Sequence, residues 1–438
     1  MNEPNLYTVR QDGELQAGLP VSVDLASLTG KKMLRRSIVC LFELFFLLFV
    51  HAGRFKADPR FAWIPFDVTV FFFSLSVVTG GFAFVLRTFR FTKLSIRASF
   101  MGVALFAFIA LSYCWTPSSV YATEKIARVV VLTQASFLGA ALIIAQSTEN
   151  VRTFMRLQLL FSTWVAVEVG LDSLQSSGGF IDAMGGGYLG EGLNLAIGGL
   201  IAFFAAVTGD KSRIRRVAWG VVAMVFAYLL FQTGARMALF VFLLGIPAIL
   251  VQTIECSTIS GIRFSRYSAR AGMVFLALVI CLLAYTFFAS NSAMTLVRVR
   301  VLTVPGLGAS ASVRLSYWIA ALDLWLRSPI IGHGIGSWPI LMGFGEIRSF
   351  PHNILLELFV EQGVLGVAAF LALLWCVLRI RGRHRLVRSP FQKRSLRSLL
   401  LAVWLACFAY AMVHGHLADN RELFAFTGML AWSGGELK

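Results

Sequence analysis

The chain has 438 residues, of which 58% are hydrophobic and only 14% charged, and its mean hydropathy is +0.76. An apolar content this high excludes an ordinary soluble domain. The formal net charge is +17, but the basic residues form short clusters between apolar runs, which excludes the single basic face of a nucleic-acid-binding domain. We therefore predict an all-α, polytopic integral membrane protein that binds membrane lipids and no nucleic acid.

The N-terminal residues do not have the pattern of a signal peptide. Residues 1–30 are polar and lack a basic start, an apolar core and a small-residue cleavage site, so we expect residues 1–36 to form a cytoplasmic tail. The six cysteines are scattered without a C-x-x-C pair. We interpret them as packing residues and not as disulfide or metal ligands.

Apolar runs near the 20 residues that a span requires predict about twelve transmembrane helices. We place nine of them within residues 37–290 and three within residues 353–438. The predicted spans are 37–53, 62–86, 99–115, 128–147, 157–174, 191–208, 217–233, 236–255, 271–290, 353–378, 398–415 and 422–435, of which the last is the shortest.

The distribution of Lys and Arg between alternate loops predicts the orientation. With the N-terminal tail inside, 27 of the 39 basic residues lie on the cytoplasmic side and 12 on the other. Both termini and the basic loop 379–397 are then on the cytoplasmic side, and the long insert at 291–352 lies outside.

The insert contains a segment with helical periodicity, residues 312–327. Its apolar and polar residues fall on opposite faces, which predicts an amphipathic helix that lies on the membrane surface and ends before Pro329. The apolar face holds Leu315, Trp318, Leu322 and Trp325, and the polar face holds Ser312, Ser316, Asp323 and Arg327. The G-x-G-x-G at 332–336 lacks the flanking strand of a dinucleotide site, so we interpret it as a flexible turn.

Three residues on the predicted outer face could act on a phosphorylated substrate: Arg236, Arg314 and His352. Guanidinium groups bind phosphate oxygens through two parallel hydrogen bonds, and a neutral imidazole can accept a proton from a hydroxyl. A charge within the apolar stretch around Arg236 costs about 2.5 kcal/mol or more if it is deep, which marks it as a functional candidate. The alternatives are a snorkelling arginine at 236, a solvated charge at 314 and an interface histidine at 352.

Other polar residues give weaker signals. Glu357 and Glu361 share one helical face, either as paired carboxylates or as a structural contact to a neighbouring helix. His333, His414 and His416 have no accompanying carboxylate or thiolate pattern, so we predict no metal.

Four segments resemble the bacterial O-antigen ligase and O-antigen or exopolysaccharide polymerase superfamily. They are TGAR at 233–236, VRLSYWIAALDLWLRSPIIGHGIGSW at 313–338, PHNILLELFVEQGVLG at 351–366 and LADNRELFAFTGML at 417–430. Together with the pattern of spans, the resemblance covers nearly the whole chain from about residue 37.

The resemblance implies a glycosyltransferase-C-like fold in the bacterial inner membrane, with its active face toward the periplasm. It would act on undecaprenyl-pyrophosphate-linked oligosaccharide without a metal, a cofactor or a nucleotide sugar. Carried over by motif, Arg236 and Arg314 would hold the pyrophosphate and His352 would activate or position the acceptor hydroxyl. Further substrate-binding positions are expected in the same motifs, at Tyr317, Trp318, Asn353, Asn420 and Arg421.

The superfamily contains ligases, which transfer glycan to lipid A-core, and polymerases, which join repeat units. The segments Asp419–Glu422 and Trp63–Asp67 look more like the polymerases, and a polymerase would have a chain-length regulator and a flippase as candidate partners. A lipid-linked glycan flippase or other transporter is a third possible function. Transporters often show internal repeats with broken helices, and this sequence shows no such repeat.

Overall fold

The structure is a computed structural model, and it describes residues 25–86, 91–175, 180–208, 212–251, 254–257, 261–264, 270, 272–277, 280, 309–379 and 391–432. The long helices of this part are α1 (Leu25–His51), α2 (Val68–Val85), α3 (Lys93–Leu111), α6 (Thr148–Gln175), α7 (Tyr188–Thr208), α8 (Arg213–Gln232), α9 (Arg236–Val251), α12 (Ala309–Arg327), α14 (Ile354–Leu378) and α16 (Phe391–His414).

Shorter elements connect the long helices. They are η1 (Ala52–Arg54), η2 (Pro59–Phe61), η3 (Ser112–Trp115), α4 (Val120–Ala127), the π-helical turn η4 (Arg128–Thr133), α5 (Gln134–Leu142), η5 (Ile144–Gln146), α13 (Ser337–Leu341) and α17 (Arg421–Met429). A two-stranded antiparallel hairpin, β1 (Ile254–Ser257) with β2 (Gly261–Phe264), pairs Cys256 with Ile262.

The fold class is confirmed as a helical, polytopic membrane protein. In the described residues, eight helices or helical runs are long and apolar enough to cross a membrane, and each overlaps a predicted span. The predicted span 37–53 overlaps the second half of α1 and extends into η1, and the span 236–255 corresponds to the shorter apolar helix α9. The predicted span 271–290 and the insert residues 291–308 lie largely outside the described residues.

The predicted twelfth span, 422–435, is not seen as a span. The structure has the nine-residue helix α17 there, which is about 13 Å long at 1.5 Å per residue and so too short to cross a bilayer. Its apolar residues are buried against protein instead, including Leu423, Phe424 and Met429. In the described part of the predicted span, up to residue 432, the apolar run is therefore a short helix buried in protein.

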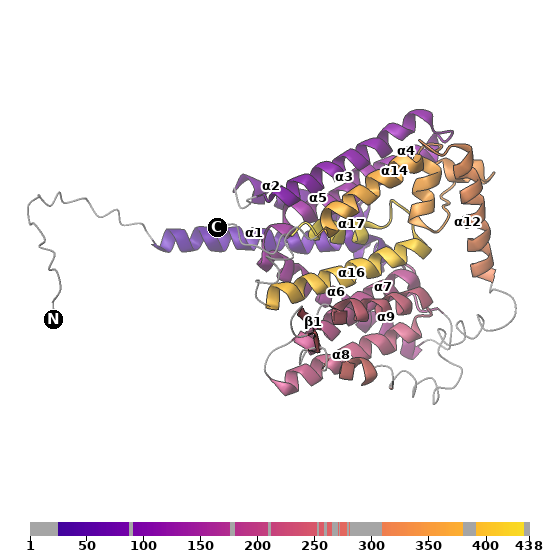
Figure 1. The fold of residues 1–438 in the computed structure, drawn as a ribbon. Helices are drawn as coiled ribbons and strands as arrows, with labels where there is room; N and C mark the ends of the chain where they lie inside the picture. The colour runs from indigo at the N-terminus through magenta and orange to yellow at the C-terminus, as the bar shows by residue number, and fades with distance from the viewer. Residues whose placement is uncertain are drawn as a thin grey trace, which may run out of the picture.

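Helices α12 and α1 mark opposite ends of the bundle (Figure 1). Most long helices run roughly alongside one another, whereas α12 lies across one end of them, and the start of α1 projects from the other end. This arrangement fits the expectation that the segment 312–327 lies along a membrane surface.

The helix predicted in the insert is present as α12, and it packs on the rest of the protein through a second stripe of residues. Its protein-facing residues are Ala321 and Leu324, with Tyr317 and Ala320 partly buried beside them. Leu315 and Leu322 are exposed, at 46% and 45%. Apolar residues occur on two stripes of this helix, and α14 covers the stripe that contains the small alanines.

The glycines at 332, 334 and 336 form a tightly packed turn and not a flexible one. All three have positive φ, between 69° and 89°, where glycine carries no steric cost. A Cβ at Gly332 would lie 2.4 Å from the carbonyl carbon of Glu361. The turn binds the backbone of α14 where that helix is interrupted at Gly363, through N–H donation from His333 to Val360 and from Gly334 to Glu361, both at 2.8 Å.

Helix α7 is the central helix, buried on almost all sides from Gly190 to Phe203. Its glycines allow close helix contacts, as small residues do between membrane helices. A Cβ at Gly192 would lie 2.6 Å from the Cβ of Ala235, and one at Gly190 would lie 2.3 Å from Nη1 of Arg54. The start of α7 is therefore held between the TGAR turn and the residues that follow α1.

Candidate functional site: a charged cavity at one end of the bundle

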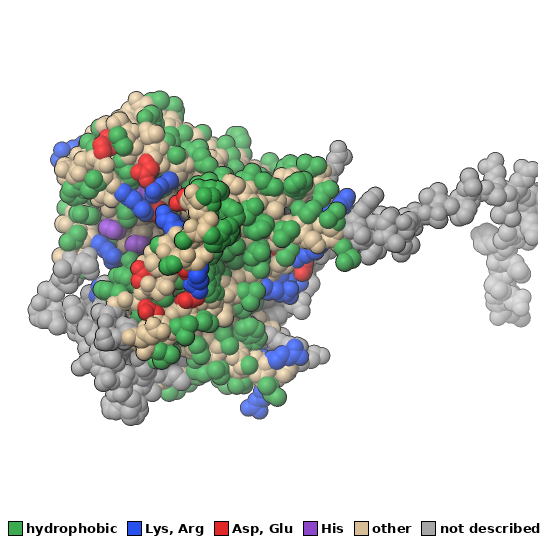
Figure 2. Space-filling view, turned by 180° about the vertical axis from the view of Figure 1, so that it is seen from behind, with side chains coloured by type: hydrophobic (Ala, Val, Ile, Leu, Met, Phe, Trp, Pro, Cys, Tyr) green, Lys and Arg blue, Asp and Glu red, His purple; other side chains and the backbone are tan. Residues whose placement is uncertain are grey.

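A polar cavity of about 570 Å³ lies where the end of α1, the end of α16 and the start of α17 meet. Figure 2 shows basic, acidic and histidine side chains gathered in a hollowed region of a surface that is otherwise mainly hydrophobic. Five basic residues line the cavity, Arg54, Lys56, Arg128, Arg348 and Arg421, with three carboxylates, Asp67, Asp419 and Glu422. Basic groups outnumber acidic ones, so the cavity favours an anionic ligand.

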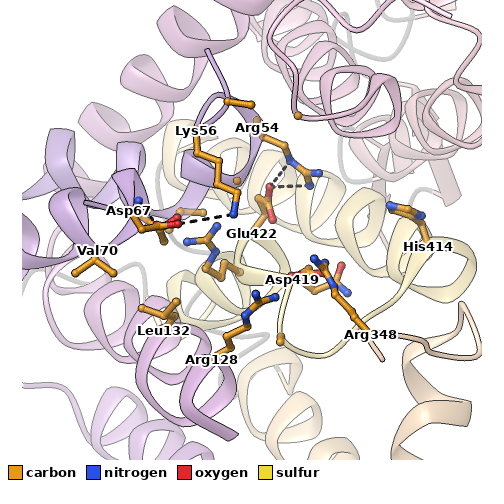
Figure 3. A pocket seen from close by; sticks show the side chains of 18 of the residues that line it. Arg54, Lys56, Asp67, Val70, Arg128, Leu132, Arg348, His414, Asp419 and Glu422 are labelled. Atoms are coloured by element: carbon orange, nitrogen blue, oxygen red, sulfur yellow. Dashed lines mark hydrogen bonds and ion pairs between the residues drawn. The ribbon is translucent and has the colours of Figure 1, made fainter. Parts of the chain in front are cut away.

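Arg54 joins the two ends of the chain across the cavity. Its Nε and Nη2 donate hydrogen bonds to Oε1 of Glu422, at 3.1 and 2.9 Å, and Figure 3 shows this pair projecting from facing elements. His51 Nδ1 lies 3.5 Å from the same oxygen. Because Gly190 leaves room only for a hydrogen beside the guanidinium, the position of Arg54 is fixed from two sides.

The loop between α16 and α17 presents Asp419 to the cavity. Arg348 donates a hydrogen bond to Asp419 Oδ2, and His416 Nδ1 lies 3.2 Å from the same oxygen. Burial alone would raise the pKa of Asp419, but His416 and Arg348 hold that pKa well below its usual range. Asp419 is therefore ionised and ties the insert, through Arg348, to the cavity wall.

Arg421 is a buried cation whose charge is only indirectly balanced. Its Nη1 donates a hydrogen bond to the Phe49 carbonyl at 2.9 Å, and its guanidinium carbon lies 5.3 Å from the Phe49 ring centroid. Within the described part of the chain no carboxylate oxygen lies within 4.0 Å of this guanidinium, unlike that of Arg54. Arg421 was predicted to bind substrate, and it lines the cavity with a guanidinium group that can still bind an anion.

Tyr410 and His414 form the wall nearest the insert. Both line the cavity from the last turns of α16, and their rings are 5.3 Å apart. The Tyr410 hydroxyl is buried and has no hydrogen-bond partner among the described residues. A buried hydroxyl without a partner costs free energy, so this group is available to a ligand in the cavity.

His352 lies beside this wall and does not itself line the cavity. Its ring centroid is 6.3 Å from that of His414 and 4.5 Å from that of Phe350, which does line it. Among the described residues His352 is the one non-glycine with positive φ, at 56°, and such backbone geometry is found preferentially at functional sites. Burial, and then the charge of Arg314, lower the pKa of His352, so its imidazole is neutral near pH 7.

The predicted residues of α12 come close to His352. Arg314 acts electrostatically on His352, and the Tyr317 ring stacks on the His352 ring at 6.3 Å. Trp318 is half-buried, and its Nε1 has no hydrogen-bond partner in the described residues. The structure thus brings Arg314, Tyr317 and His352 together.

Arg236 begins α9 two residues after the left-handed Gly234 and is half-buried. The preceding Ala235 is in contact with α7 at Gly192, two residues beyond the glycine that faces Arg54. Arg236 is therefore close to the cavity wall but does not line the cavity.

The two predicted asparagines have structural contacts. Asn353 caps α14, because its Oδ1 accepts hydrogen bonds from the backbone N–H groups of Leu355 and Leu356 at 3.0 and 3.1 Å. Asn420 lines the cavity, and its Nδ2 donates a hydrogen bond to the His416 carbonyl at 2.8 Å. The side chain of Asn353 is thus occupied in the helix cap.

A buried ion-pair network supports the loop that bears Asp419. Lys125 Nζ lies 2.5 Å from Glu357 Oε1 and 2.6 Å from Glu361 Oε1, and none of the three side chains is exposed. Glu357 Oε2 also accepts the backbone N–H of Leu417 at 2.9 Å. The two acidic residues therefore make a structural contact between α4, α14 and this loop.

Sequence reasoning missed several cavity residues, chiefly Arg54, Lys56, Arg128 and Tyr410. Each basic one belongs to the 12 Lys and Arg residues predicted on the outer face. Their presence on the less basic face could have marked these basic residues as candidates for the site. The sequence gives no indication, however, that positions 54 and 422 are in contact.

Comparison with known families gives one match. A family model described as O-antigen ligase matches residues 219–371, about a third of the chain. The match includes Arg236, Arg314, Tyr317 and His352 and ends before the C-terminal cavity residues. A search of curated proteins found no match. In the described residues, no group of three or more His, Cys, Asp or Glu is placed to hold a metal ion.

Proposed function

We propose that this chain, which carries the domain of an O-antigen ligase-related family at residues 219–371, is a metal-independent membrane glycosyltransferase. Its donor is a glycan linked to a polyprenyl pyrophosphate, and its acceptor is a hydroxyl of a second glycan. The family match supports a function of the O-antigen ligase or polymerase type in general. The specific donor and reaction are our proposal.

The observation that carries the proposal is the composition of the cavity. Its basic side chains suit the two phosphates of the donor, and the buried Arg421, which has no carboxylate within 4.0 Å in the described residues, is the strongest candidate for contact with them. Val70 and Leu132 line the same cavity, and Val70 is 46% exposed. A cavity that combines basic and apolar lining residues suits a phosphorylated lipid.

The reaction needs no covalent enzyme intermediate. The acceptor hydroxyl oxygen forms a bond to the anomeric carbon, and the bond from that carbon to the pyrophosphate oxygen breaks with its electron pair. The pyrophosphate gains negative charge in the transition state, which fixed guanidinium groups stabilise. The hydroxyl proton passes to His352, whose lowered pKa keeps the imidazole neutral and able to accept it.

We assign Arg314 and Arg236 to the pyrophosphate as well. Arg314 is supported by its electrostatic effect on both His352 and Tyr410. Arg236 is supported by the contact of its turn with the start of α7, which borders Arg54. Tyr317, Trp318 and Asn420 would contact the glycan.

Lysine substitution at Arg421 tests this function. Lysine keeps the charge but cannot offer two parallel donors, so Arg421→Lys should lower the transfer rate at least about tenfold, a barrier increase of about 1.4 kcal/mol. The control is Arg327→Lys, an exposed residue of α12 that pairs with Asp323. Transfer from a synthetic polyprenyl-pyrophosphate donor measures both, and equal rates in the two variants would remove Arg421 from the donor site.

Within the family we propose a polymerase in the bacterial inner membrane, with the cavity on the periplasmic face and both termini in the cytoplasm. The polysaccharide of a deletion strain distinguishes the alternatives. Single repeat units on the lipid carrier would support a polymerase, with a chain-length regulator and a flippase as partners. Full-length chains retained on the carrier would instead indicate a ligase that uses a lipid A-core acceptor.

A further inference from the structure

A second basic groove lies at the opposite end of the bundle from the charged cavity. It has a volume of about 630 Å³ and lies between the first turns of α3 and the last turns of α14. Helix α14 begins at Ile354, two residues after His352, is interrupted at Gly363 and ends at Leu378. Its part after the interruption is about 22 Å long at 1.5 Å per residue. The groove is therefore near the other membrane face and is separate from the glycan site.

The groove combines two arginines with apolar walls. Arg97 and Arg379 are both exposed and both line it. The Arg379 guanidinium carbon lies 5.6 Å from the Trp375 ring centroid, which orients the charge along the groove. Within the described residues, neither guanidinium makes a hydrogen bond or an ion pair, so their charge is not balanced by a neighbouring carboxylate.

The apolar walls are unusually exposed. Phe100, Trp375 and Ile96 line the groove with exposed fractions of 75%, 65% and 54%. In a membrane protein these surfaces face acyl chains, and an aromatic residue such as Trp375 favours the level of the lipid headgroups. The arginines thus lie at headgroup level and the hydrophobic residues lie deeper, as the two parts of one phospholipid do.

We propose that this groove binds one anionic diacyl phospholipid, with its phosphate between Arg97 and Arg379 and an acyl chain along Phe100 and Trp375. Basic pockets between transmembrane helices bind anionic headgroups in this way. A neutral lipid has no net charge to balance the two guanidinium groups, so charge complementarity selects the anionic class. The lipid joins the start of α3 to the end of α14 and is neither donor nor acceptor.

Native mass spectrometry of the full chain tests the proposal. The protein is released from detergent micelles that contain either phosphatidylglycerol or phosphatidylcholine with the same acyl chains. We expect the wild type to retain more phosphatidylglycerol, and Arg97→Gln with Arg379→Gln to retain one molecule fewer. A similar groove near Arg213 and Arg216 is unchanged in this variant, so the readout is the loss of one molecule.

A matched control removes two charges elsewhere. Arg152→Gln with Arg156→Gln changes the first three turns of α6, where both residues are predicted on the same membrane side, and should leave lipid retention unchanged. Equal retention of the two lipids by the wild type, or undiminished phosphatidylglycerol in the Arg97 and Arg379 variant, would overturn the proposal. Displacement of the lipid by soluble glycerol 3-phosphate would overturn it too, since it would indicate a site for free phosphate.

Discussion

His352 combines a constrained backbone with a ring that is neutral at physiological pH. Its φ of 56° is a conformation that asparagine and histidine adopt more readily than most residues do, so His352→Asn should preserve the fold better than alanine. Loss of a general base typically costs a factor of 10² to 10⁴, and we expect the variant to lose at least about a hundredfold in transfer rate.

Thermal unfolding of purified His352→Asn provides the control for folding. If the variant unfolds at the wild-type temperature and still transfers glycan at nearly the wild-type rate, His352 is only an interface residue.

The effect of Arg314 on His352 predicts a pH dependence. Burial and Arg314 both lower the pKa of His352, so the activity of the wild type should fall only as the pH drops through this lowered pKa. Arg314→Gln removes one of the causes that lower this pKa, since the protonated imidazole is no longer repelled by the arginine charge. The pKa rises, and the acid limb of kcat/KM should move to higher pH. An unchanged limb with a lower plateau would mean that Arg314 acts on the substrate alone.

Individual site residues could be predicted where a local motif marks them, and not otherwise. His352, Arg314 and Arg421 each occur in a recognisable segment. Arg54 and Lys56 follow the first span in RFKADPR, where nothing local distinguishes them from basic residues at any helix end. The position of Arg54 depends on contacts with the distant residues Glu422 and Gly190, and Lys56 pairs with Asp67.

Among the elements, the contact between α4 and α14 depends on a buried triad. Removal of Lys125 leaves Glu357 and Glu361 buried without their cation, and breaking a buried pair in this way costs roughly 3–5 kcal/mol. Lys125→Met should therefore lower the thermal unfolding temperature in detergent. Adding Glu357→Gln and Glu361→Gln should restore much of it, because neutral amides carry no charge penalty.

The triad also predicts an effect on activity. Glu357 holds the backbone of Leu417, two residues before Asp419, so the stabilised triple variant should remain impaired in glycan transfer. Full activity in that variant would show that the loop keeps its position without the carboxylate.

The existence of α12 could be predicted from its periodicity, whereas the stripe that packs on α14 could not. Leu315 and Leu322 recur at helical spacing, but so do Tyr317, Ala321 and Leu324. Which stripe faces the protein depends on α14, whose surface accepts small side chains closely. The exposed stripe, which includes Leu315, Ile319 and Leu322, is left for the membrane.

For the whole molecule, the charge distribution predicts a testable orientation. In a variant without natural cysteines, Ile347→Cys in the insert should react with an impermeant thiol reagent in intact spheroplasts. Lys93→Cys at the start of α3 should react only after lysis. Ile347 is 53% exposed, so its labelling depends on orientation and not on access. The reverse pattern would place the cavity on the cytoplasmic face and contradict the proposed site of the reaction.

Most of the long apolar helices could be located from apolar runs, because burial in lipid and burial in protein both select such runs. For the same reason the sequence could not distinguish a span from α17, whose short apolar segment is buried in protein. Distinguishing the two requires the contacts of the neighbouring helices.

The pairing of Arg54 with Glu422 can form only late in the synthesis of the chain. These residues are 368 positions apart, so the ribosome completes nearly the whole chain before the arginine meets its carboxylate. Until then the incomplete chain carries an arginine without its carboxylate partner just after the end of α1. This incomplete chain is accessible to chaperones and to membrane proteases. A nascent chain that stops before Glu422 should therefore be degraded rather than accumulate, and a separately expressed C-terminal fragment that contains α16 and α17 should protect it.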